Sequence, residues 1–309
     1  MLLPISTTGL VGDERMRFGT VTIFNMGILY NKIMKLSLCI AVYNEEKNLY
    51  YPMDSAIDFV DEVVIVDGGS TDRTIEIAKS YGKKVRIINS DNPVMFHKNK
   101  QKAIEATKGE WILQLDADEE VSEDLKKEII NLLQNQRSKI KDQKEEVAFW
   151  IPRKNWFLTG FLMKGGQYPD YTIRLYKNGF AKFPCKDVHE NVEIIDQRSN
   201  IKDQKAEVGF LKNPILHYAD PDFSRYLMRW DRYTSAEVEI LVRNKAINFS
   251  ISQFLNFFLV KPLSTFLMMY FRHKGFMDGF PGFVFALFSS IRFWVIYIKF
   301  KVQKSNIKN

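Results

Sequence analysis

Short apolar runs that end in polar residues recur through the first half of the chain. The runs span residues 35–42, 62–67 and 111–115. Each is followed by a helical pattern of apolar and polar positions, at about 47–57, 71–81 and 122–136. Continuous apolar runs of this length are typical of parallel strands that helices cover on both faces. The pattern predicts repeated βαβ units, and hence an α/β fold with a mostly parallel sheet flanked by helices.

The polar residues that end these runs are candidates for a ligand site. They are Tyr43, Asn44, Glu45, Asp67, Asp116 and Asp118. In open α/β sheets, ligands bind outside the carboxyl ends of the strands, so we expect these side chains to converge on one crevice. Two aspartates one residue apart at a strand end can bind a hard divalent cation that carries a phosphate. An isolated Asp-x-Asp is also common in solvated turns, so this prediction depends on the neighbouring strands.

The second half of the predicted domain extends the sheet. Residues 147–153 and 171–176 have the pattern of strands, and the charge-mixed residues 134–146 predict a connector made of a helix end and an exposed loop. Residues 160–166 contain glycines and aromatic neighbours. We expect a hairpin there, with a mobile flap over the ligand as the alternative. His217 follows a short apolar run, which places it at another strand end.

A long helix is predicted over about residues 222–243. Asp220-Pro221 supplies an N-cap and a proline in the first turn. Arg225, Arg229 and Arg232 are spaced so that they share one face of this helix. Such a stripe can bind a diphosphate or an anionic acceptor, although arginines on a helix surface are often only solvated.

The positive charge of the chain is concentrated in residues 241–309. From Arg243 onward there are ten Lys and Arg residues and one acid, Asp278, a formal charge of +9. The whole chain carries +7, so the preceding residues carry −2. A basic, apolar tail of this kind favours an anionic membrane surface as its partner. The basic residues are interleaved with Phe, Leu, Ile and Trp rather than gathered on a polar face, which argues against nucleic acid.

Two apolar stretches lie within this tail, at residues 254–271 and 279–300. Lys261-Pro262 interrupts the first, and Arg292 and Lys299 charge the second. A transmembrane helix normally needs about 18 or more apolar residues without such interruptions. We therefore expect an amphipathic helix that lies in the membrane interface. Helices that pack on the catalytic domain, or that form a dimer seam, are the alternative.

The patterns predict three regions. Residues 1–33 lack a clean signal-peptide architecture, and we expect them to be a non-native or disordered extension ahead of Met34. An extra strand at residues 19–24 is the alternative. Residues 34–240 form one α/β domain, with a first half at 34–130 and a second half at 147–240. Residues 241–309 form the basic, apolar helical tail.

The motifs taken together resemble the family 2 glycosyltransferases, which have the nucleotide-sugar-binding GT-A fold. The matching pieces are Ala41–Glu46, Asp67–Thr74, Ala103–Trp111 and Asp116–Glu119. The chain is also similar to bacterial enzymes that add a sugar to the lipopolysaccharide core or to related surface glycans. The pieces that carry this second likeness are Tyr168–Asp170, Arg174, Val188–Glu190, His217-Tyr218, Arg232-Tyr233 and Gly275–Gly282.

The resemblance implies roles for individual residues. The nucleotide-sugar-binding residues would be Tyr43, Asn44, Glu45, Asp67, Lys100, Asp116 and Arg229. Lys100 stands where family members often have arginine, which keeps the cation but not a bidentate contact. Asp118 would bind Mg²⁺ or Mn²⁺ on the diphosphate. His217 is a candidate second ligand, because a late histidine joins the metal in some GT-A enzymes and neutral imidazole suits Mn²⁺; a structural histidine is the alternative.

Inverting transfer needs a base that removes the proton of the acceptor hydroxyl. A carboxylate suits this role if it lies within hydrogen-bond reach of that hydroxyl. By motif, Glu190 of His189-Glu190 is our candidate, with Asp170 and Asp187 as weaker ones. The alternative interpretation of Glu190 is a surface acid beside a core histidine.

The predicted function is an inverting, metal-dependent glycosyltransferase. It would move a sugar from a nucleotide-diphosphate donor, a UDP-sugar by default, to a hydroxyl of a lipid-linked glycan in lipopolysaccharide or surface-polysaccharide biosynthesis. A polyprenyl-phosphate glycosyltransferase and a non-catalytic nucleotide-binding protein are the alternatives. Cys39 and Cys185 provide no disulfide framework, which suits a reducing cytosol. We therefore expect a cytoplasmic protein that is peripheral on the inner face of the cell membrane.

Overall fold

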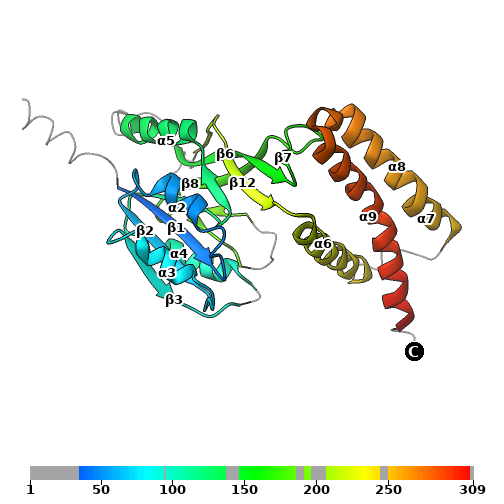
Figure 1. The fold of residues 1–309 in the computed structure, drawn as a ribbon, viewed down its shortest axis with the longest axis horizontal. Coiled ribbons are helices and arrows are strands. Elements are labelled where there is room, and N and C mark those ends of the chain that lie inside the picture. The colour runs from blue at the N-terminus through cyan, green and yellow to red at the C-terminus, as the bar shows by residue number, and fades with distance from the viewer. Residues whose placement is uncertain are drawn as a thin grey trace, which may run out of the picture.

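A computed structural model describes most of the chain. The described residues are 35–93, 95–136, 146–185, 191–195, 207–243 and 250–306. The predicted N-terminal extension lies outside these ranges, as do residues 137–145 of the connector and the candidate bases Glu190 and Asp187. An α/β part and a helical part lie side by side (Figure 1).

Parallel strands in the order β3-β2-β1-β4 form the first half of a ten-stranded sheet. Their bounds are β1 Leu36–Val42, β2 Glu62–Asp67, β3 Val85–Asn89 and β4 Trp111–Gln114. The three predicted strands are therefore confirmed. The sequence pattern missed β3, because this strand is only half buried and carries Arg86 within its short apolar run.

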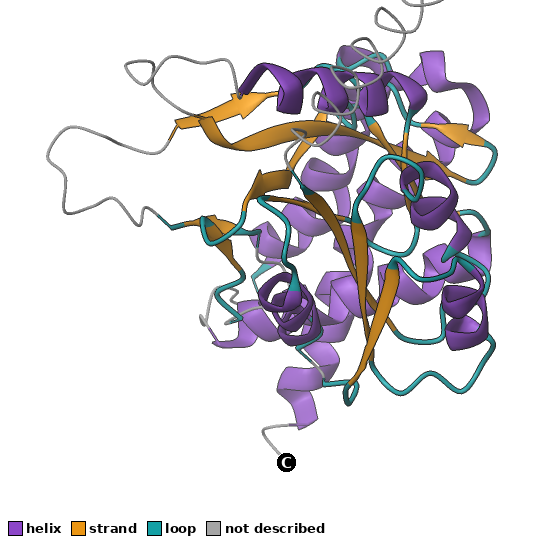
Figure 2. Cartoon of the chain, turned by 90° about the vertical axis from the view of Figure 1, so that its left-hand side faces the viewer, coloured by secondary structure: helices purple, strands orange, loops and turns teal. Residues whose placement is uncertain are grey.

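Helices cover both faces of these strands, which is why the runs are apolar without alternation (Figure 2). The helices are α2 Tyr50–Ala56, α3 Thr74–Ser80, α4 His97–Ala106 and α5 Glu123–Gln136. Leu38 of β1 belongs to a core cluster that includes Met53 of α2 and Leu125 of α5. Its neighbour Cys39 belongs to a second cluster, with Ala103 of α4. Successive side chains of β1 thus enter opposite cores, as the period of a strand requires.

The second half of the sheet is mixed. Its strands are β5 Glu119–Val121, β6 Glu146–Phe157, β7 Gly160–Phe161, β8 Asp170–Lys177, β11 Glu207–Phe210 and β12 Ile215–Asp220. β8 runs antiparallel to β4 and β6, and β12 runs parallel to β6. β9 Ala181–Lys182 and β10 Glu193–Ile194 form a separate small pair. The strands predicted at 147–153 and 171–176 are confirmed, and 160–161 begin a hairpin with β6.

The C-terminal part is helical, as predicted. It consists of α6 Phe223–Arg243, α7 Ile251–Leu255, η1 Asn256–Val260, α8 Lys261–Phe266, η2 Leu267–Arg272, η3 Gly275–Asp278 and α9 Gly279–Asn306. The segment from α7 to η2 and helix α9 form an antiparallel hairpin, with α6 near α9 (Figure 1). Two helices of this hairpin, Ile251–Arg272 and Gly275–Gln303, are long and apolar enough to cross a membrane.

Pro262 does not end the first of these helices, although the sequence pattern treats Lys261-Pro262 as an interruption. A proline in a helix cannot donate to the carbonyl four residues earlier, here that of Phe258. The helix passes through the π-helical turn η1 just before the proline. The indole N–H of Trp294 donates to the Phe258 carbonyl at 2.9 Å. A partner on α9 therefore satisfies the group that the proline leaves free.

Candidate functional site

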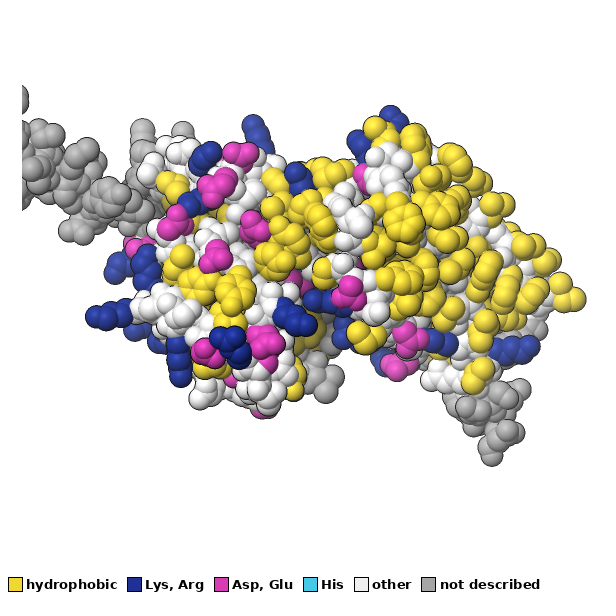
Figure 3. Space-filling view, in the orientation of Figure 1, with side chains coloured by type: hydrophobic (Ala, Val, Ile, Leu, Met, Phe, Trp, Pro, Cys, Tyr) yellow, Lys and Arg dark blue, Asp and Glu magenta, His cyan; other side chains and the backbone are white. Residues whose placement is uncertain are grey.

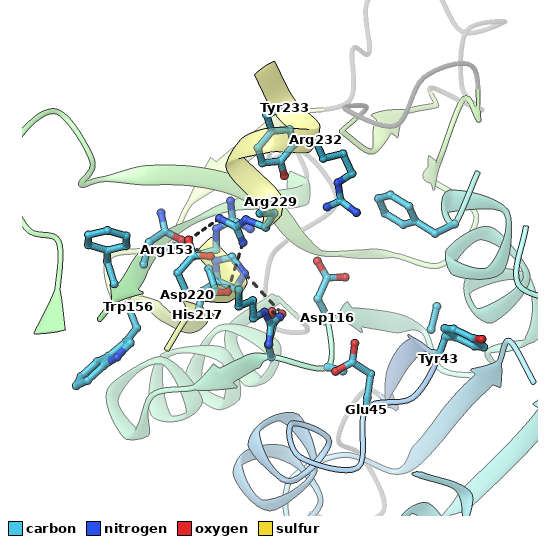
Figure 4. A pocket seen from close by; sticks show the side chains of 18 of the residues that line it. Tyr43, Glu45, Asp116, Arg153, Trp156, His217, Asp220, Arg229, Arg232 and Tyr233 are labelled. Atoms are coloured by element: carbon cyan, nitrogen blue, oxygen red, sulfur yellow. Dashed lines mark hydrogen bonds and ion pairs between the residues drawn. The ribbon is translucent and has the colours of Figure 1, made fainter. Parts of the chain in front are cut away.

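A cleft of about 570 Å³ opens at the carboxyl ends of β1, β4 and β12. Of the predicted site residues, those that line it are Tyr43, Glu45, Lys100, Asp116, Asp118, His217 and Arg229. Tyr43 and Glu45 lie at one end, Arg229 at the opposite end, and Asp116 between them (Figure 4). The sheet thus brings these residues together from segments that are far apart in the sequence.

Asn44 and Asp67 hold the turns beside the cleft and are not among its lining residues. The amide oxygen of Asn44 accepts a hydrogen bond from the backbone N–H of Thr71 at 2.8 Å, and Asn44 has a left-handed φ of 55°. The buried Asp67 carboxylate accepts bonds from the backbone N–H of Gly69 at 3.1 Å and from the Ser70 hydroxyl at 2.5 Å. Both side chains therefore shape the loops that follow β1 and β2.

Asp116 is held in its ionised form by two cations. Its carboxylate forms an ion pair with Lys100 and a second with Arg174, at 2.7 Å. Burial alone would raise the pKa of Asp116, but the charges of Arg174 and Lys100 outweigh it and keep that pKa well below its usual range. The backbone N–H of Asp116 also donates to Glu119 at 2.9 Å. Asp116 is thus a fixed negative group at the floor of the cleft.

Arg174, which is buried, and Arg153, which lines the cleft, form an ion network that the sequence analysis did not assign. The Arg174 guanidinium is 6% exposed and also lies 2.8 Å from the Glu119 carboxylate. Arg153 contacts Glu119 at 3.2 Å and Asp170 at 2.7 Å. One signal was available, because an arginine inside an otherwise apolar strand needs a buried carboxylate as its partner.

Asp118 and His217 lie side by side in the cleft. The Nε2 atom of His217 is 3.5 Å from the Asp118 carboxylate, and Arg225 approaches the other carboxylate oxygen at 3.2 Å. Burial works to raise the pKa of Asp118, but the neighbouring His217 and Arg225 outweigh it and lower that pKa. Asp118 is therefore an anion with one cation beside it and an imidazole within reach.

A chain of hydrogen bonds fixes the orientation of His217. The side-chain N–H of Asn155 donates to Asp170 at 3.0 Å, so the Asn155 amide oxygen faces His217. That oxygen lies 2.7 Å from His217 Nδ1, which must then carry the proton and donate it. The other ring nitrogen, Nε2, is left facing Asp118. This is the arrangement that orients metal-binding histidines.

Asp170, one of the weaker candidates for the base, belongs to the hydrogen-bond chain that orients His217 through Asn155. Burial would raise its pKa, but Arg153 and Asn155 outweigh it and lower that pKa below its usual range. Asp170 is not among the residues that line the cleft. A carboxylate that is ion-paired in this way is a weak proton acceptor.

The side chains of Asp118 and His217 fit a divalent cation whose remaining ligands come from a substrate and water. Within the described ranges, no group of three or more His, Cys, Asp or Glu side chains is arranged as a metal site. Asp118 offers a carboxylate oxygen and His217 an imidazole nitrogen. Mg²⁺ is commonly bound by one or two carboxylates together with substrate phosphates and water, and imidazole suits Mn²⁺.

The helix α6 carries its arginines into the cleft. Arg225, Arg229 and Arg232 line it together with the neighbouring Tyr233. Arg229 forms an ion pair with Asp220 at 2.7 Å. Figure 4 shows Arg229, Arg232 and Tyr233 on the side of the cleft opposite Glu45. The predicted stripe therefore lies along the cleft, where Arg225 and Arg229 are half-buried and Arg232 is exposed.

Asp222 caps α6, and the prediction that Asp220 does so is wrong. The backbone N–H of Arg225 donates to the Asp222 carboxylate at 2.7 Å. Asp220 is the last residue of β12, buried at the cleft wall, where burial raises its pKa in spite of Arg229. Its Oδ1 atom and the Nε atom of Arg229 have no hydrogen-bond partner within the described part of the chain. Asp220 is thus a cleft residue that the sequence analysis missed.

Glu45 is the acidic group at the end of the cleft that Tyr43 also lines. The side-chain amide of Asn48 donates to its carboxylate at 2.6 Å, and its backbone N–H donates to the Thr74 hydroxyl at 2.8 Å. Burial raises the pKa of Glu45 more than the bond from Asn48 lowers it, and the charge of Asp118 adds to the rise. Tyr43 beside it exposes almost half of its surface.

Comparison with known proteins gives consistent matches. The model for "Glycosyl transferase family 2" matches residues 37–187. An uncharacterized glycosyltransferase of Rickettsia typhi is 27% identical over 265 residues, and the match covers 84% of each chain. The lipopolysaccharide core biosynthesis glycosyltransferase LpsC of Rhizobium meliloti is 24% identical over 272 residues, again with 84% of each chain covered.

Among solved structures, a mannosyltransferase of Pyrobaculum calidifontis in complex with GDP-Man and Mn²⁺ aligns with a TM-score of 0.48. It is 11% identical, and the alignment covers 92% of this chain and 97% of that one.

The segment matched by the family model contains β1, β2 and β4 with the acidic residues at their ends. Residues after β1 and β4 line the cleft, and β2 lies next to β1 in the sheet. The chain is a glycosyltransferase with a family 2 domain over residues 37–187, a mixed α/β fold and a C-terminal helical region of two apolar helices.

Proposed function

We propose that this enzyme is an inverting, metal-dependent glycosyltransferase that uses a nucleotide-diphosphate sugar, a UDP-sugar by resemblance. The acceptor would be a hydroxyl of a lipid-linked glycan in lipopolysaccharide or surface-polysaccharide biosynthesis. The observation that carries the proposal is the cleft itself. It places Glu45, the Asp118–His217 pair and the arginines of α6 in sequence along one channel. The similarity to LpsC supports a surface glycan as the acceptor.

The donor would lie with its nucleoside over Tyr43 and Glu45 and its diphosphate near Asp118. The exposed ring of Tyr43 offers a face on which a base can stack. Asp116 is already fixed by Lys100 and Arg174, so it can contact the donor without rearranging. Such preorganised groups stabilise charge in the transition state at little further cost.

Asp118 and His217 would hold Mg²⁺ or Mn²⁺ on the diphosphate. When bound, the cation neutralises the negative charge that develops on the departing diphosphate. Asn155 keeps the Nε2 lone pair of His217 directed at that position. Arg225 would move from Asp118 to a phosphate oxygen as the donor binds, because it pairs with the same carboxylate.

Glu190 is the proposed base. As the acceptor oxygen attacks the anomeric carbon, the bond from that carbon to the diphosphate oxygen breaks. The acceptor proton passes to the Glu190 carboxylate, and the nucleoside diphosphate leaves with the electron pair of the broken bond. The basic, apolar tail would keep the enzyme on the cytoplasmic face of the membrane, where a lipid-linked acceptor is found.

Donor binding tests the proposal directly. We expect calorimetric titration to detect a UDP-sugar, with affinity that rises when Mn²⁺ is added and falls when the metal is removed with EDTA. A panel of UDP-, GDP- and dTDP-sugars identifies the donor, and release of the nucleoside diphosphate shows turnover. An enzyme with no nucleotide affinity in either the presence or absence of divalent ions would contradict the proposal.

A polyprenyl-phosphate acceptor is the second candidate. The arginine stripe of α6 lies beside the apolar hairpin, where it could bind a lipid phosphate. Such an acceptor is already ionised and needs no general base, which makes Glu190 the residue that separates the two functions.

We expect Glu190→Gln to lower kcat by about 10²- to 10³-fold, in the range of general-base catalysis. The amide keeps the size of the side chain but cannot accept the proton. The measurement is steady-state sugar transfer, with Glu193→Gln, an exposed glutamate of β10, as the matched control. A kcat that stays within threefold of the parent enzyme would favour the phosphate acceptor.

A further inference from the structure

We propose that the hairpin Ile251–Gln303 docks on an anionic lipid surface with both of its helices parallel to the membrane plane. The surface it presents is the outer, exposed face of the hairpin. The inference rests on the membrane attachment in the proposed function and specifies how the hairpin lies on the membrane. It does not depend on which sugar is transferred.

Apolar side chains predominate over the hairpin on the face shown in Figure 3. Leu259 and Leu263, one turn apart on the first helix, are 59% and 61% exposed. Val260, Leu267 and Phe271 are further exposed apolar residues of the first helix. In the most apolar part of the first helix only 11% of the residues are buried, and in that of the second helix 33% are. A continuous apolar surface of this extent indicates a site of interaction with lipid or protein.

The tip of the hairpin is fastened to the catalytic domain. The backbone N–H of Lys164 donates to the Asp278 carboxylate at 2.7 Å. The next residue, Gly165, donates its N–H to the backbone carbonyl of His273 at 2.9 Å. Both donors belong to the loop that follows β7, and that loop lines the cleft with Leu162 and Gln167. The tip therefore lies on the water-facing side of the molecule, with the catalytic domain.

The far end of α9 is fastened to the same side through α6. The Lys299 ammonium donates to the Asp231 carboxylate at 2.6 Å, to the Thr234 hydroxyl at 2.9 Å and to the Ser235 hydroxyl at 2.8 Å. Between tip and base, the indole of Trp230 on α6 donates to the Phe288 carbonyl at 3.2 Å. Polar contacts thus hold the inner face of α9 along its whole length.

These attachments exclude a membrane-spanning arrangement of this structure. Asp278 and Lys299 are 21 residues apart, and a helical rise of about 1.5 Å per residue separates them by about 30 Å. This equals the thickness of the hydrocarbon core, about 30 Å. A spanning hairpin would put these two contacts on opposite sides of the bilayer and would draw the charged helix α6 into it. Buried charges of that kind are costly, so the hairpin fits the interface and not the interior.

Charge favours lipid over a second copy of the chain. Arg272, Lys274 and Lys301 are exposed basic residues of the hairpin, and Asp278 is the one acid from Arg243 to the end of the sequence. A two-fold symmetric contact would bring the same basic patch against itself. Anionic headgroups complement it, and the attraction weakens as salt screens it.

Sedimentation with vesicles tests the surface. We expect the full chain to bind vesicles that contain phosphatidylglycerol, to bind pure phosphatidylcholine vesicles more weakly, and to lose affinity as salt rises. Leu259→Asp with Leu263→Asp should lower the partition into anionic vesicles by at least about tenfold, because two carboxylates would enter the apolar layer. Phe210→Asp on β11, where the parent residue is 63% exposed, is the matched control and should bind like the parent.

Two outcomes of this experiment would contradict the proposal that this surface binds lipid. One is a double variant that binds vesicles as tightly as the parent. The other is a parent chain that is a dimer without lipid, binds no vesicles, and becomes a monomer in the double variant. In that case the face would be a contact between copies. Donor binding is measured in the same samples, so loss of lipid binding is distinguished from failure of the sugar chemistry.

Chemical labelling tests the orientation. In a Cys185→Ser background, Arg272→Cys places a thiol at the exposed tip, and Ser252→Cys places one at the base as a control. The protein is added to preformed vesicles and treated with a membrane-impermeant maleimide. For a hairpin that lies in the plane, both thiols are labelled before detergent is added. If the tip thiol reacts only after detergent while the base thiol reacts before it, the hairpin spans the bilayer and the inference is wrong.

Discussion

Replacing Asp118 with asparagine is expected to lower kcat for sugar transfer by about 10³-fold, as for the loss of a group that stabilises transition-state charge. Asparagine keeps the shape of the side chain but removes the charge that faces His217 and Arg225. The proposed metal would then lose its anionic protein ligand. Turnover is measured in Mn²⁺ and again after removal of the metal with EDTA.

The metal response separates this effect from a general loss of structure. For the parent enzyme, EDTA should abolish transfer and added Mn²⁺ should restore it, whereas Asp118→Asn should stay inactive in both conditions. Its melting temperature should remain close to that of the parent. Asp124→Asn on the exposed face of α5 is the control and should retain full activity. An Asp118→Asn enzyme that still responds to Mn²⁺ with normal turnover would disprove this role.

Arg174→Met is expected to lower the free energy of unfolding by about 3–5 kcal/mol, the usual cost of removing one partner of a buried ion pair. Methionine is also long and unbranched, so it leaves little empty space. The change removes the cation that contacts both Asp116 and Glu119, and Glu119 is fully buried. Two carboxylates would remain in a low-dielectric site, with Lys100 and Arg153 as their remaining partners. Urea unfolding at pH 7 measures the change.

Arg73→Met gives the contrasting result. Arg73 forms an ion pair with Glu76 at 3.0 Å, but both side chains are exposed to solvent. Water screens such a pair, so we expect no measurable change in the unfolding midpoint. Equal midpoints for Arg174→Met and Arg73→Met would show that the buried network does not stabilise the fold. A combined Arg174→Met, Glu119→Gln variant should recover part of the loss, because it removes one unpaired charge.

Local sequence patterns were sufficient to predict β1, β2 and β4 in the first half of the sheet, but not the half-buried β3. β1, β2 and β4 are apolar over their full length because both faces are covered, and few other structures produce that pattern. Their order in a parallel sheet then brings the residues after each strand to one edge. Seven of the predicted site residues line the cleft. Six of them lie on a β-strand, in the loop after one, or on α4, and the seventh, Arg229, lies on α6.

The parts that failed depend on contacts between distant segments. Asp222 rather than Asp220 caps α6, because Asp220 ends β12 beside β6 and forms its ion pair with Arg229. The continuity of the first apolar helix at Pro262 depends on Trp294, more than thirty residues away. Neither partner is visible in the local pattern of residues, because each interaction exists only once the chain has folded.

The hydrogen bonds from Lys164 and Gly165 to the hairpin tip also fix the distance between the hairpin and the cleft. The same loop forms part of the cleft wall through Leu162 and Gln167. With the hairpin seated on lipid, the reacting centre would be held at a constant height above the headgroups. With the proposed lipid-linked acceptor, the enzyme would then transfer sugar only to positions close to the lipid anchor. Positions further along a growing glycan would be modified by other transferases.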